Sequence, residues 1–301
     1  MATSSSKNFE LDVADYVEEA FERCGLEVRT GYDLKTARRS LNLLFADWAN
    51  RGLNRWTISQ EKLTLANNIS EYPLGTLTLS VVSSSSFSAG ETITGGTSSA
   101  TASVTSIPSS TSLAITIPDG TFSSGETVTG GTSSASTTTS ATVDLTDITS
   151  SIDILSAVVR QNDGTSTQSD VSISRVSRDT FLSINNKRST ARPTQFYVDR
   201  QVIPTLKIWP TPDSSTSYKL VYDRLIRIQD ADAASNTVDV PFRFYPCLTA
   251  GLAYYMAMKK APDRVKLLKA VYEEEFERAA AEDRDRSSLS LTPSSTYYQL
   301  I

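Results

Sequence analysis

Histidine is absent from this chain of 301 residues, and its absence removes the commonest catalytic arrangements. Ser-His-Asp and Cys-His nucleophiles need an imidazole, and so does the usual general base near neutral pH. The two cysteines, Cys24 and Cys247, lie far apart in the sequence, so we expect neither a structural zinc site nor a disulfide framework. Each lies in an apolar helical pattern, which predicts a buried thiol in a protein assembled in a reducing cytoplasm.

Other candidates for ligand binding depart from the known motifs. The glycine pairs Gly95-Gly96 and Gly130-Gly131 lack the following Lys-Ser/Thr of a phosphate loop and therefore predict β-turns. One loop contains four side-chain oxygen donors, Asp230, Asp232, Asn236 and Asp239. Their spacing is not that of an EF-hand and the bidentate glutamate is missing, which favours a solvated loop. The sequence therefore predicts no metal and no cofactor.

Paired carboxylates can cleave glycosidic bonds, and one helical segment is rich in them. Its acidic residues are Glu273, Glu274, Glu275, Asp283 and Asp285, and they alternate with Arg278, Arg284 and Arg286. Interleaved charges are typical of a solvated helix face with local ion pairs, so we predict no catalytic residue and no enzyme. A peptidoglycan hydrolase stays open as an alternative, which a carboxylate pair in a cleft would favour.

A basic segment, residues 185–193, is the more informative charge pattern. Three cations, Lys187, Arg188 and Arg192, lie within six residues and are followed by Pro193. This composition predicts an exposed loop. The loop is either simply solvated, or it contacts an acidic partner or the DNA backbone.

The overall charge argues against tight binding of nucleic acid. The formal net charge is -5, whereas gripping DNA phosphates needs clustered lysine and arginine. Such a surface suits a channel wall past which DNA slides. No apolar run approaches the roughly 18 residues that span a bilayer, and the polar start, Met1 to Lys7, does not have the pattern of a signal peptide, so we expect no membrane contact.

Helical periodicity marks both ends of the chain. Residues 9–25 and 33–51 predict two helices joined by a short turn, with Asp33 as the cap of the second. Its apolar stripe is Leu34, Ala37, Leu41, Leu44, Phe45 and Trp48. Two C-terminal helices follow Pro241 and Pro262, and the last has the stripe Val265, Leu268, Tyr272, Phe276 and Ala279.

Between the helices the apolar period becomes two, which indicates strands. Residues 56–65 and 69–74 predict a β-hairpin, and Pro210 with Pro212 and Asp213 predicts another between 206–209 and 218–222. Ser177 can cap a short helix that holds Phe181. The strands expected after the middle of the chain are 152–160, 171–176, 195–200, 205–209 and 218–226.

Residues 76–150 are dominated by Ser, Thr and Gly and contain an internal repeat. The sequence of 87–100 returns at 122–135 with a period of roughly 35 residues. Aromatic and β-branched residues at fixed positions predict an inserted antiparallel β module, while a disordered linker is the alternative.

The expected fold class is α+β, in which a helical layer formed by the N- and C-terminal helices accompanies a β-rich middle and the inserted module. The expected divisions are 1–75, the N-terminal part of the core with a helical hairpin and a β-hairpin; 76–150, the module; 151–286, the C-terminal part of the core; and 287–301, an extended tail. The tail ends in apolar residues that we expect to dock on a neighbour, Tyr297, Tyr298, Leu300 and Ile301.

Three stretches together resemble the podoviral head-to-tail adaptor family, also called tail accessory or tail tubular A proteins. They are Gly31 to Asn54 followed by Trp56; Val176 to Arg178 with Pro193 to Tyr197 and Leu206 to Asp213; and Val240-Pro241 opening a helix that contains Leu252-Ala253. The resemblance covers most of residues 8–75 and 150–280. The repeat module is a departure from it. Phage surface proteins often carry such modules, so we expect this one to face outward, toward tail fibres or the host.

The resemblance implies a structural virion protein at the head-tail junction. It implies a homo-oligomeric ring, typically a dodecamer, between the portal protein and the tail nozzle protein, with genomic DNA passing through the lumen. It also implies that the C-terminal tail binds the portal or an adjacent subunit. A fibre or adhesin-like virion protein is the alternative that the repeats favour, although it accounts poorly for helices at both ends.

Overall fold

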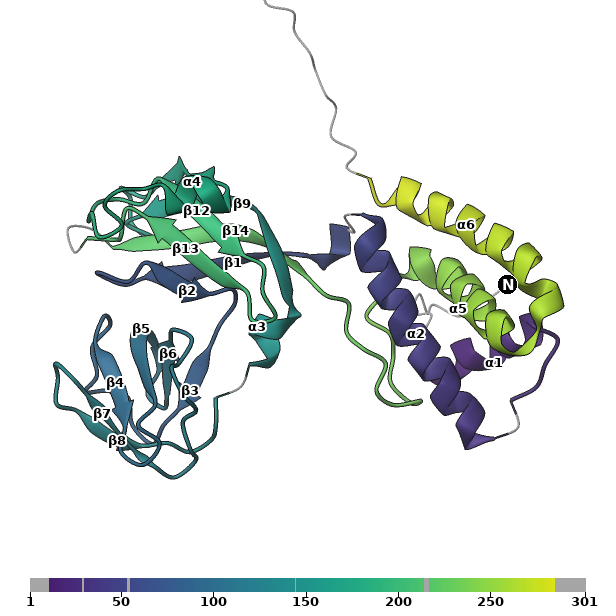
Figure 1. Cartoon of the computed structure of the whole chain (residues 1–301), viewed down its shortest axis with the longest axis horizontal. Helices are drawn as coiled ribbons and strands as arrows, with labels where there is room; N and C mark the ends of the chain where they lie inside the picture. Colours follow the sequence, from purple (N-terminus) through teal and green to yellow (C-terminus); the bar gives the residue numbers. More distant parts are fainter. Residues whose placement is uncertain (1–10, 29, 53–54, 144, 214–216, 285–301) are drawn as a thin grey trace, which may run out of the picture. The chain divides into compact units, whose positions relative to one another are not determined.

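The computed structural model describes residues 11–28, 30–52, 55–143, 145–213 and 217–284. Its internal contacts divide the chain into two units (Figure 1). The helical unit is formed by Met1–Trp56 together with Ile228–Ile301, and the β unit by Thr57–Arg227. The chain is mixed α+β: its N- and C-terminal helices pack together, and the sequence between them forms three sheets, which confirms the expected fold class.

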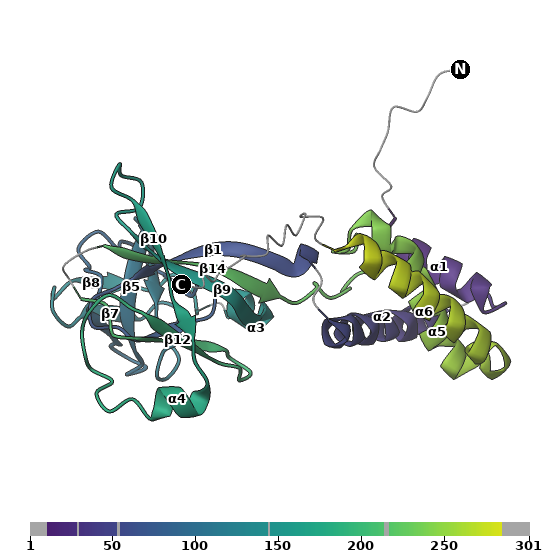
Figure 2. The same ribbon diagram turned by 90° about the horizontal axis from the view of Figure 1, so that it is seen from above.

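The helical unit is organised around one helix, α5, which contacts the other three. Its elements are α1 (Val13–Arg23), α2 (Gly31–Arg51), η1 (Arg55–Thr57, at the border with the β unit), η2 (Phe242–Phe244), α5 (Tyr245–Lys260), η3 (Pro262–Arg264) and α6 (Val265–Glu282). Figure 2 shows α1, α2, α5 and α6 gathered together. α5 packs against α1, α2 and α6, and these contacts leave no room for a side chain at Gly251. A Cβ at that position would lie 2.9 Å from Leu44 and 2.9 Å from Tyr272.

Capping boxes fix the starts of α1 and α2. Asp12 caps α1 and exchanges hydrogen bonds with Asp15, and Thr30 caps α2 and exchanges them with Asp33. The prediction that Asp33 is the cap is therefore wrong by three positions. The Asp33 carboxylate accepts from the Thr30 N–H at 3.2 Å, and the Thr30 hydroxyl accepts from the Asp33 N–H. Thr30 is therefore the N-cap residue, and Asp33 lies in the first turn of the helix.

The apolar stripes of α2 and α6 meet in the core, as the sequence predicts. Trp48 has no exposed surface, and its ring contacts Trp56, Phe244 and Phe276. Its indole N–H donates to the Tyr272 hydroxyl at 3.0 Å. Cys24 and Cys247 are free and buried, as expected.

Two four-stranded sheets of the β unit enclose one core. Their orders are β1-β14-β9-β10 and β11-β12-β13-β2. The elements are β1 (Ile58–Leu65), β2 (Glu71–Pro73), α3 (Thr146–Ser150), β9 (Ser151–Gln161), β10 (Ser169–Ser172), β11 (Ser174–Arg175), α4 (Arg178–Leu182), β12 (Gln195–Asp199), β13 (Thr205–Trp209) and β14 (Tyr218–Ile226). Ser177 caps α4 as predicted, by accepting a hydrogen bond from Thr180.

Both predicted β-hairpins are wrong, because in each the chain crosses from one sheet to the other. β1 pairs with β14, from Ile58 opposite Leu225 to Leu65 opposite Tyr218, and β2 pairs with β13. The Tyr72 hydroxyl holds the first crossing by bonding both backbone groups of Ala66. Alternation identifies the buried face of a strand but not its partner, and here both sheets bury that face in a shared core.

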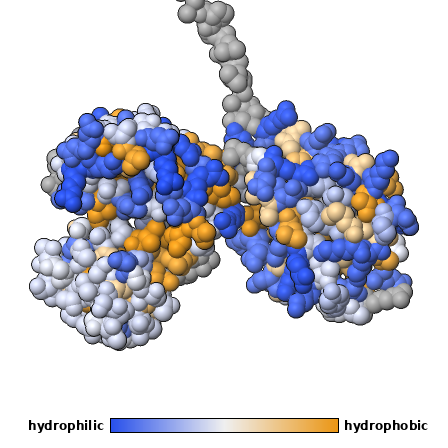
Figure 3. Space-filling view, viewed as in Figure 1, coloured by the Kyte–Doolittle hydropathy of each residue, from blue (hydrophilic) through white to orange (hydrophobic). Residues whose placement is uncertain are grey.

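The repeat segment folds as a third, six-stranded antiparallel sheet, so the alternative of a disordered linker is wrong. The order is β3-β6-β5-β4-β7-β8, with β3 (Thr78–Ser80), β4 (Thr92–Gly95), β5 (Thr101–Ser109), β6 (Ser112–Ile115), β7 (Thr127–Gly130) and β8 (Ser136–Thr138). Val82 N–H donates to Thr138 O, and Ser140 N–H donates to Ser80 O, both at 2.9 Å, so the two outer strands meet and the sheet closes. In Figure 3 the surface of this module is pale, as its Ser and Thr content requires.

The two repeats face each other across β4 and β7, which pair antiparallel. Each repeat supplies a buried glutamate that binds the turn of the other. Glu91 accepts from the backbone and hydroxyl of Ser133, and Glu126 accepts from the backbone and hydroxyl of Ser98. A Cβ at Gly95 would lie 2.7 Å from the Glu126 carboxylate. The first glycine of each pair therefore makes room for the other repeat's glutamate.

We expect Glu126→Gln to destabilise the β unit by about 1–3 kcal/mol, because every group that bonds this carboxylate is a donor, and an amide NH2 would leave a donor unpaired. Burial alone would raise the pKa of Glu126, but these hydrogen bonds outweigh it and lower the pKa. Stability from a lowered carboxyl pKa is present above about pH 4.3 and is lost as the pH falls through the folded-state value. Urea unfolding at several pH values measures both effects, and the wild type should lose stability in acid more steeply than the variant.

Glu71→Gln is the matched control, because the Glu71 side chain is 58% exposed on β2, where it pairs with Lys207. Its cost should stay within about 0.5 kcal/mol. Equal losses for the two variants would contradict the role of Glu126 in the module.

A buried arginine connects the module to the two four-stranded sheets, here called the host sheets. Arg224 on β14 binds Glu61 and Asp147, and it donates to the Ser151 hydroxyl at 2.9 Å. Asp147 also accepts from the backbone of Thr76 at 2.7 Å, so the two ends of the module are held at the same point.

Candidate functional site

The residues that the structure describes include no group of three or more His, Cys, Asp or Glu side chains placed to hold a metal ion. Among the same residues no helix is both long enough and apolar enough to cross a bilayer. The loop of Asp230 to Asp239 is tied within itself: the Asn236 amide donates to Asp232 at 2.5 Å, and Asp239 accepts from Gln229.

The carboxylates of α6 are engaged in ion pairs rather than arranged as a hydrolytic pair. Glu274 and Glu275 bind Arg278 at 2.5 and 3.1 Å, as predicted for a solvated face. Glu273 instead binds Arg51 of α2 at 2.5 Å. Asp283, expected on that face, has a side chain that is only 6% exposed; it binds Arg243 and accepts a hydrogen bond from the backbone N–H of Arg55. Asp285 and Arg286 lie outside the described residues.

The basic loop, residues 185–193, is held against the end of β13. Trp209 donates its indole N–H to Asn186 O at 2.9 Å, and backbone bonds join Thr211 to Ser189 and Ala191 at 2.9 and 3.0 Å. The loop therefore leaves α4 and returns to the sheet along a hydrogen-bonded path.

The three predicted cations of this loop have different roles. Lys187 is used internally, because its ammonium donates to Leu182 O at 2.9 Å and Ile184 O at 3.1 Å, at the end of α4. Arg188 and Arg192 are exposed, and neither has an ion-pair partner among the described residues. Arg178 on α4 is exposed in the same way. The structure therefore leaves two of the predicted cations, with Arg178, open for an anionic partner.

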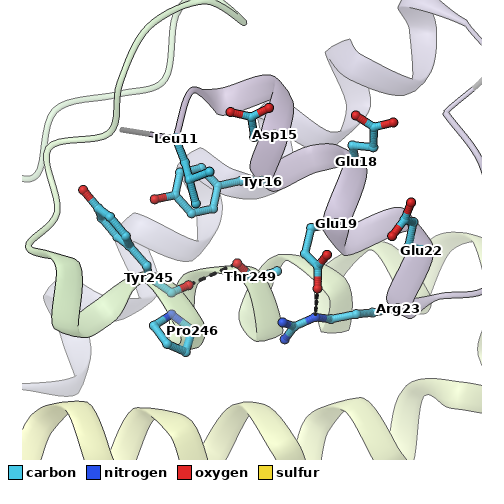
Figure 4. Close-up of a pocket in the computed structure, with 10 residues that line it drawn as sticks. All are labelled: Leu11, Asp15, Tyr16, Glu18, Glu19, Glu22, Arg23, Tyr245, Pro246 and Thr249. Atoms are coloured by element: carbon cyan, nitrogen blue, oxygen red, sulfur yellow. Dashed lines mark hydrogen bonds and ion pairs between the residues drawn. The ribbon is translucent and has the colours of Figure 1, made fainter. Parts of the chain in front are cut away.

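Sequence reasoning missed a second surface, a groove of about 530 Å³ on the helical unit (Figure 4). Its lining residues are Leu11, Asp15, Tyr16, Glu18, Glu19, Glu22, Arg23, Tyr245, Pro246 and Thr249. The acidic ones recur at positions i, i+3, i+4 and i+7 of α1. That spacing is visible in the sequence and could have identified one acidic helix face.

The predicted docking residues at the end of the tail, Tyr297, Tyr298, Leu300 and Ile301, lie outside the described residues. Their role stays a prediction.

Taken together, these features define a two-unit α+β protein with an exposed basic loop on the β unit and an acidic groove on the helical unit. The sequence matches the SU10 adaptor protein family over residues 124–296, which is more than half of the chain. The chain belongs to this family of phage head-to-tail adaptors, and the predicted resemblance is confirmed. The matched range begins just before β7, includes β9 to β14, the basic loop and both C-terminal helices, and ends beyond α6. No protein of curated function matches the chain.

Proposed function

We propose that this phage virion adaptor assembles into a homo-oligomeric ring at the head-tail junction, where it connects the portal protein to the tail nozzle protein. The observation that carries the proposal is the family match, which includes both C-terminal helices and most of the host strands. A dodecamer is the expected ring. The family is structural, and we propose that the chain has no enzymatic activity.

The charge of the chain supports a lumen through which genomic DNA passes with weak contact only. With a formal net charge of -5, the subunit adds no general attraction for phosphate. Arg178, Arg188 and Arg192 are exposed cations on the β unit. They form too small a cluster to bind duplex DNA tightly at physiological salt.

The repeat module supports a second proposal, contact with tail fibres. Its sheet is closed by the bonds between β3 and β8, so it offers no free strand edge for uncontrolled pairing. A fibre or adhesin-like virion protein remains the alternative function that this module favours.

The C-terminal tail, 287–301, is proposed to bind the portal or an adjacent subunit. Burying a large apolar side chain contributes about 1.5–3 kcal/mol before the cost of ordering the chain. Four such side chains on each subunit of a ring would add up to a firm joint.

The test is co-sedimentation of the purified chain with portal rings, combined with electron microscopy of the pellets. We expect the full-length chain to sediment with the portal and to appear as a ring at one end of it. Truncation after Arg286 should leave the circular dichroism unchanged and reduce portal binding.

A matched pair of tail variants sharpens the test. Tyr297→Ser/Tyr298→Ser should weaken binding as the truncation does, whereas Ser294→Ala/Ser295→Ala should bind like the wild type. Equal binding by all four forms would remove the tail from the joint, and no binding by the full-length chain would overturn the adaptor proposal itself.

A further inference from the structure

The exposed face of α1 carries four acidic side chains, and internal contacts account for two of them. Asp15, Glu18, Glu19 and Glu22 are all exposed on it. Asp15 belongs to the capping box and Glu19 pairs with Arg23 at 2.8 Å, but Glu18 and Glu22 have no ion-pair partner among the described residues. Like charges four positions apart on a helix repel each other, so this face is stabilised when an external cation approaches it.

The groove beside this face has an aromatic floor (Figure 4). Tyr16 and Tyr245 meet edge to face, with ring centroids 5.6 Å apart. Tyr16 is only 1% exposed, and its hydroxyl makes no hydrogen bond of normal geometry within the part of the chain that the structure describes. A buried hydroxyl without a partner is costly, so the floor of the groove favours a ligand that brings a polar group as well as charge.

A planar guanidinium fits this environment better than other cations. It can bind a carboxylate through two parallel hydrogen bonds and stack on a tyrosine ring at the same time. The groove volume of about 530 Å³ accommodates arginine side chains on a loop.

The chain itself supplies such a loop. Arg188 and Arg192 are exposed and free of ion pairs within the described residues, and the loop that carries them is held by Trp209 and Thr211. Because the loop is already ordered, binding it costs little conformational entropy.

We propose that the basic loop of one subunit docks in the α1 groove of the next, with Arg188 and Arg192 facing Glu18 and Glu22. The two surfaces differ, so the contact is heterologous, and a heterologous contact repeated with a closing rotation builds a ring. This inference rests on the proposed ring and names the surfaces that join its subunits.

The experiment reverses the charge of each surface in the full-length chain and follows assembly by sedimentation velocity at low salt. The groove variant is Glu18→Lys/Glu22→Lys, and the loop variant is Arg188→Glu/Arg192→Glu. We expect each variant by itself to associate at least about 30-fold more weakly than the wild type. Mixed in equal amounts the two should assemble again, since every interface of an alternating ring then pairs opposite charges.

A third variant, Lys266→Glu/Lys269→Glu, changes the same charge on exposed positions of α6 and must not rescue the groove variant. The proposal is overturned if the wild type stays monomeric, or if the groove variant or the loop variant alone assembles as the wild type does. It is also overturned if the mixture stays dissociated while a chain with all four reversals assembles, because the contact then lies within one chain. Variants that assemble normally and still bind portal rings would leave the adaptor function standing without this interface.

Discussion

Trp48→Ala is expected to destabilise the helical unit by about 3–5 kcal/mol, the largest effect of any single substitution considered for this protein. The indole is fully buried among Trp56, Phe244 and Phe276, so its removal leaves a cavity lined by rigid rings. The Tyr272 hydroxyl also loses the hydrogen bond that the indole N–H donates to it at 3.0 Å. Urea unfolding followed by far-ultraviolet circular dichroism, to which the helices contribute most, measures the change.

Leu43→Ala on the same helix is the matched control, because Leu43 is 54% exposed and should cost within about 0.5 kcal/mol. Trp48→Phe keeps most of the volume and separates packing from the hydrogen bond. A Trp48→Ala cost as small as that of Leu43→Ala would show that the aromatic core of this unit is wrongly described.

Arg224→Met is expected to cost the β unit about 2–3 kcal/mol. The arginine side chain is 6% exposed and binds Glu61 and Asp147, which methionine would leave without their cation. The effect stays below that of a fully buried pair because Asp147 is 43% exposed and can be hydrated. Burial alone would lower the pKa of Arg224, but Asp147 and Glu61 raise it, so the arginine remains charged.

The position of Arg224 predicts where the loss of stability in Arg224→Met appears. Hydrogen exchange of the Thr76 amide, which donates to Asp147, should accelerate, because the arginine orients that carboxylate. Arg175→Met is the control, since the Arg175 side chain is 42% exposed in its pair with Asp153 and should cost at most about 1 kcal/mol. Unchanged exchange at Thr76 would show that the module is held without Arg224.

The helices could be predicted from the sequence because their signals are local. The stripe ending at Trp48 and the caps near Thr30 lie within a few turns of the residues they organise. The strands were also recognised, but their partners were not. β1 pairs with β14, about 160 positions away, and neither alternation nor turn residues carry information about a partner at that distance.

The repeat shows the same division at a finer scale. Its period and its apolar positions identify two equivalent β segments, and the structure confirms them as β4 and β7 with their neighbours. The reason for Glu91, Glu126 and the glycines opposite them lies in the contact between the two copies. A single copy read alone contains no sign of it.

The candidate surfaces divide likewise. Composition identified Lys187, Arg188 and Arg192 as one basic loop. Only the structure shows that Lys187 donates to the end of α4, while the two arginines have no ion-pair partner among the described residues. The groove was missed because its floor, Tyr245, and its acidic wall on α1 are more than 200 positions apart.

By itself the sequence determined the fold class, the family resemblance, the helical ends and the existence of a β module, since each depends on local periodicity, composition or the order of motifs. The tertiary structure alone decided which strands pair, that the chain crosses between sheets at Tyr72 and after Trp209, how Arg224 fastens the module, and which charges remain unpaired. The physical reason is that pairing, burial and ion-pair formation depend on groups brought together from distant positions. Their energies are settled by the whole packed arrangement and not by neighbours along the chain.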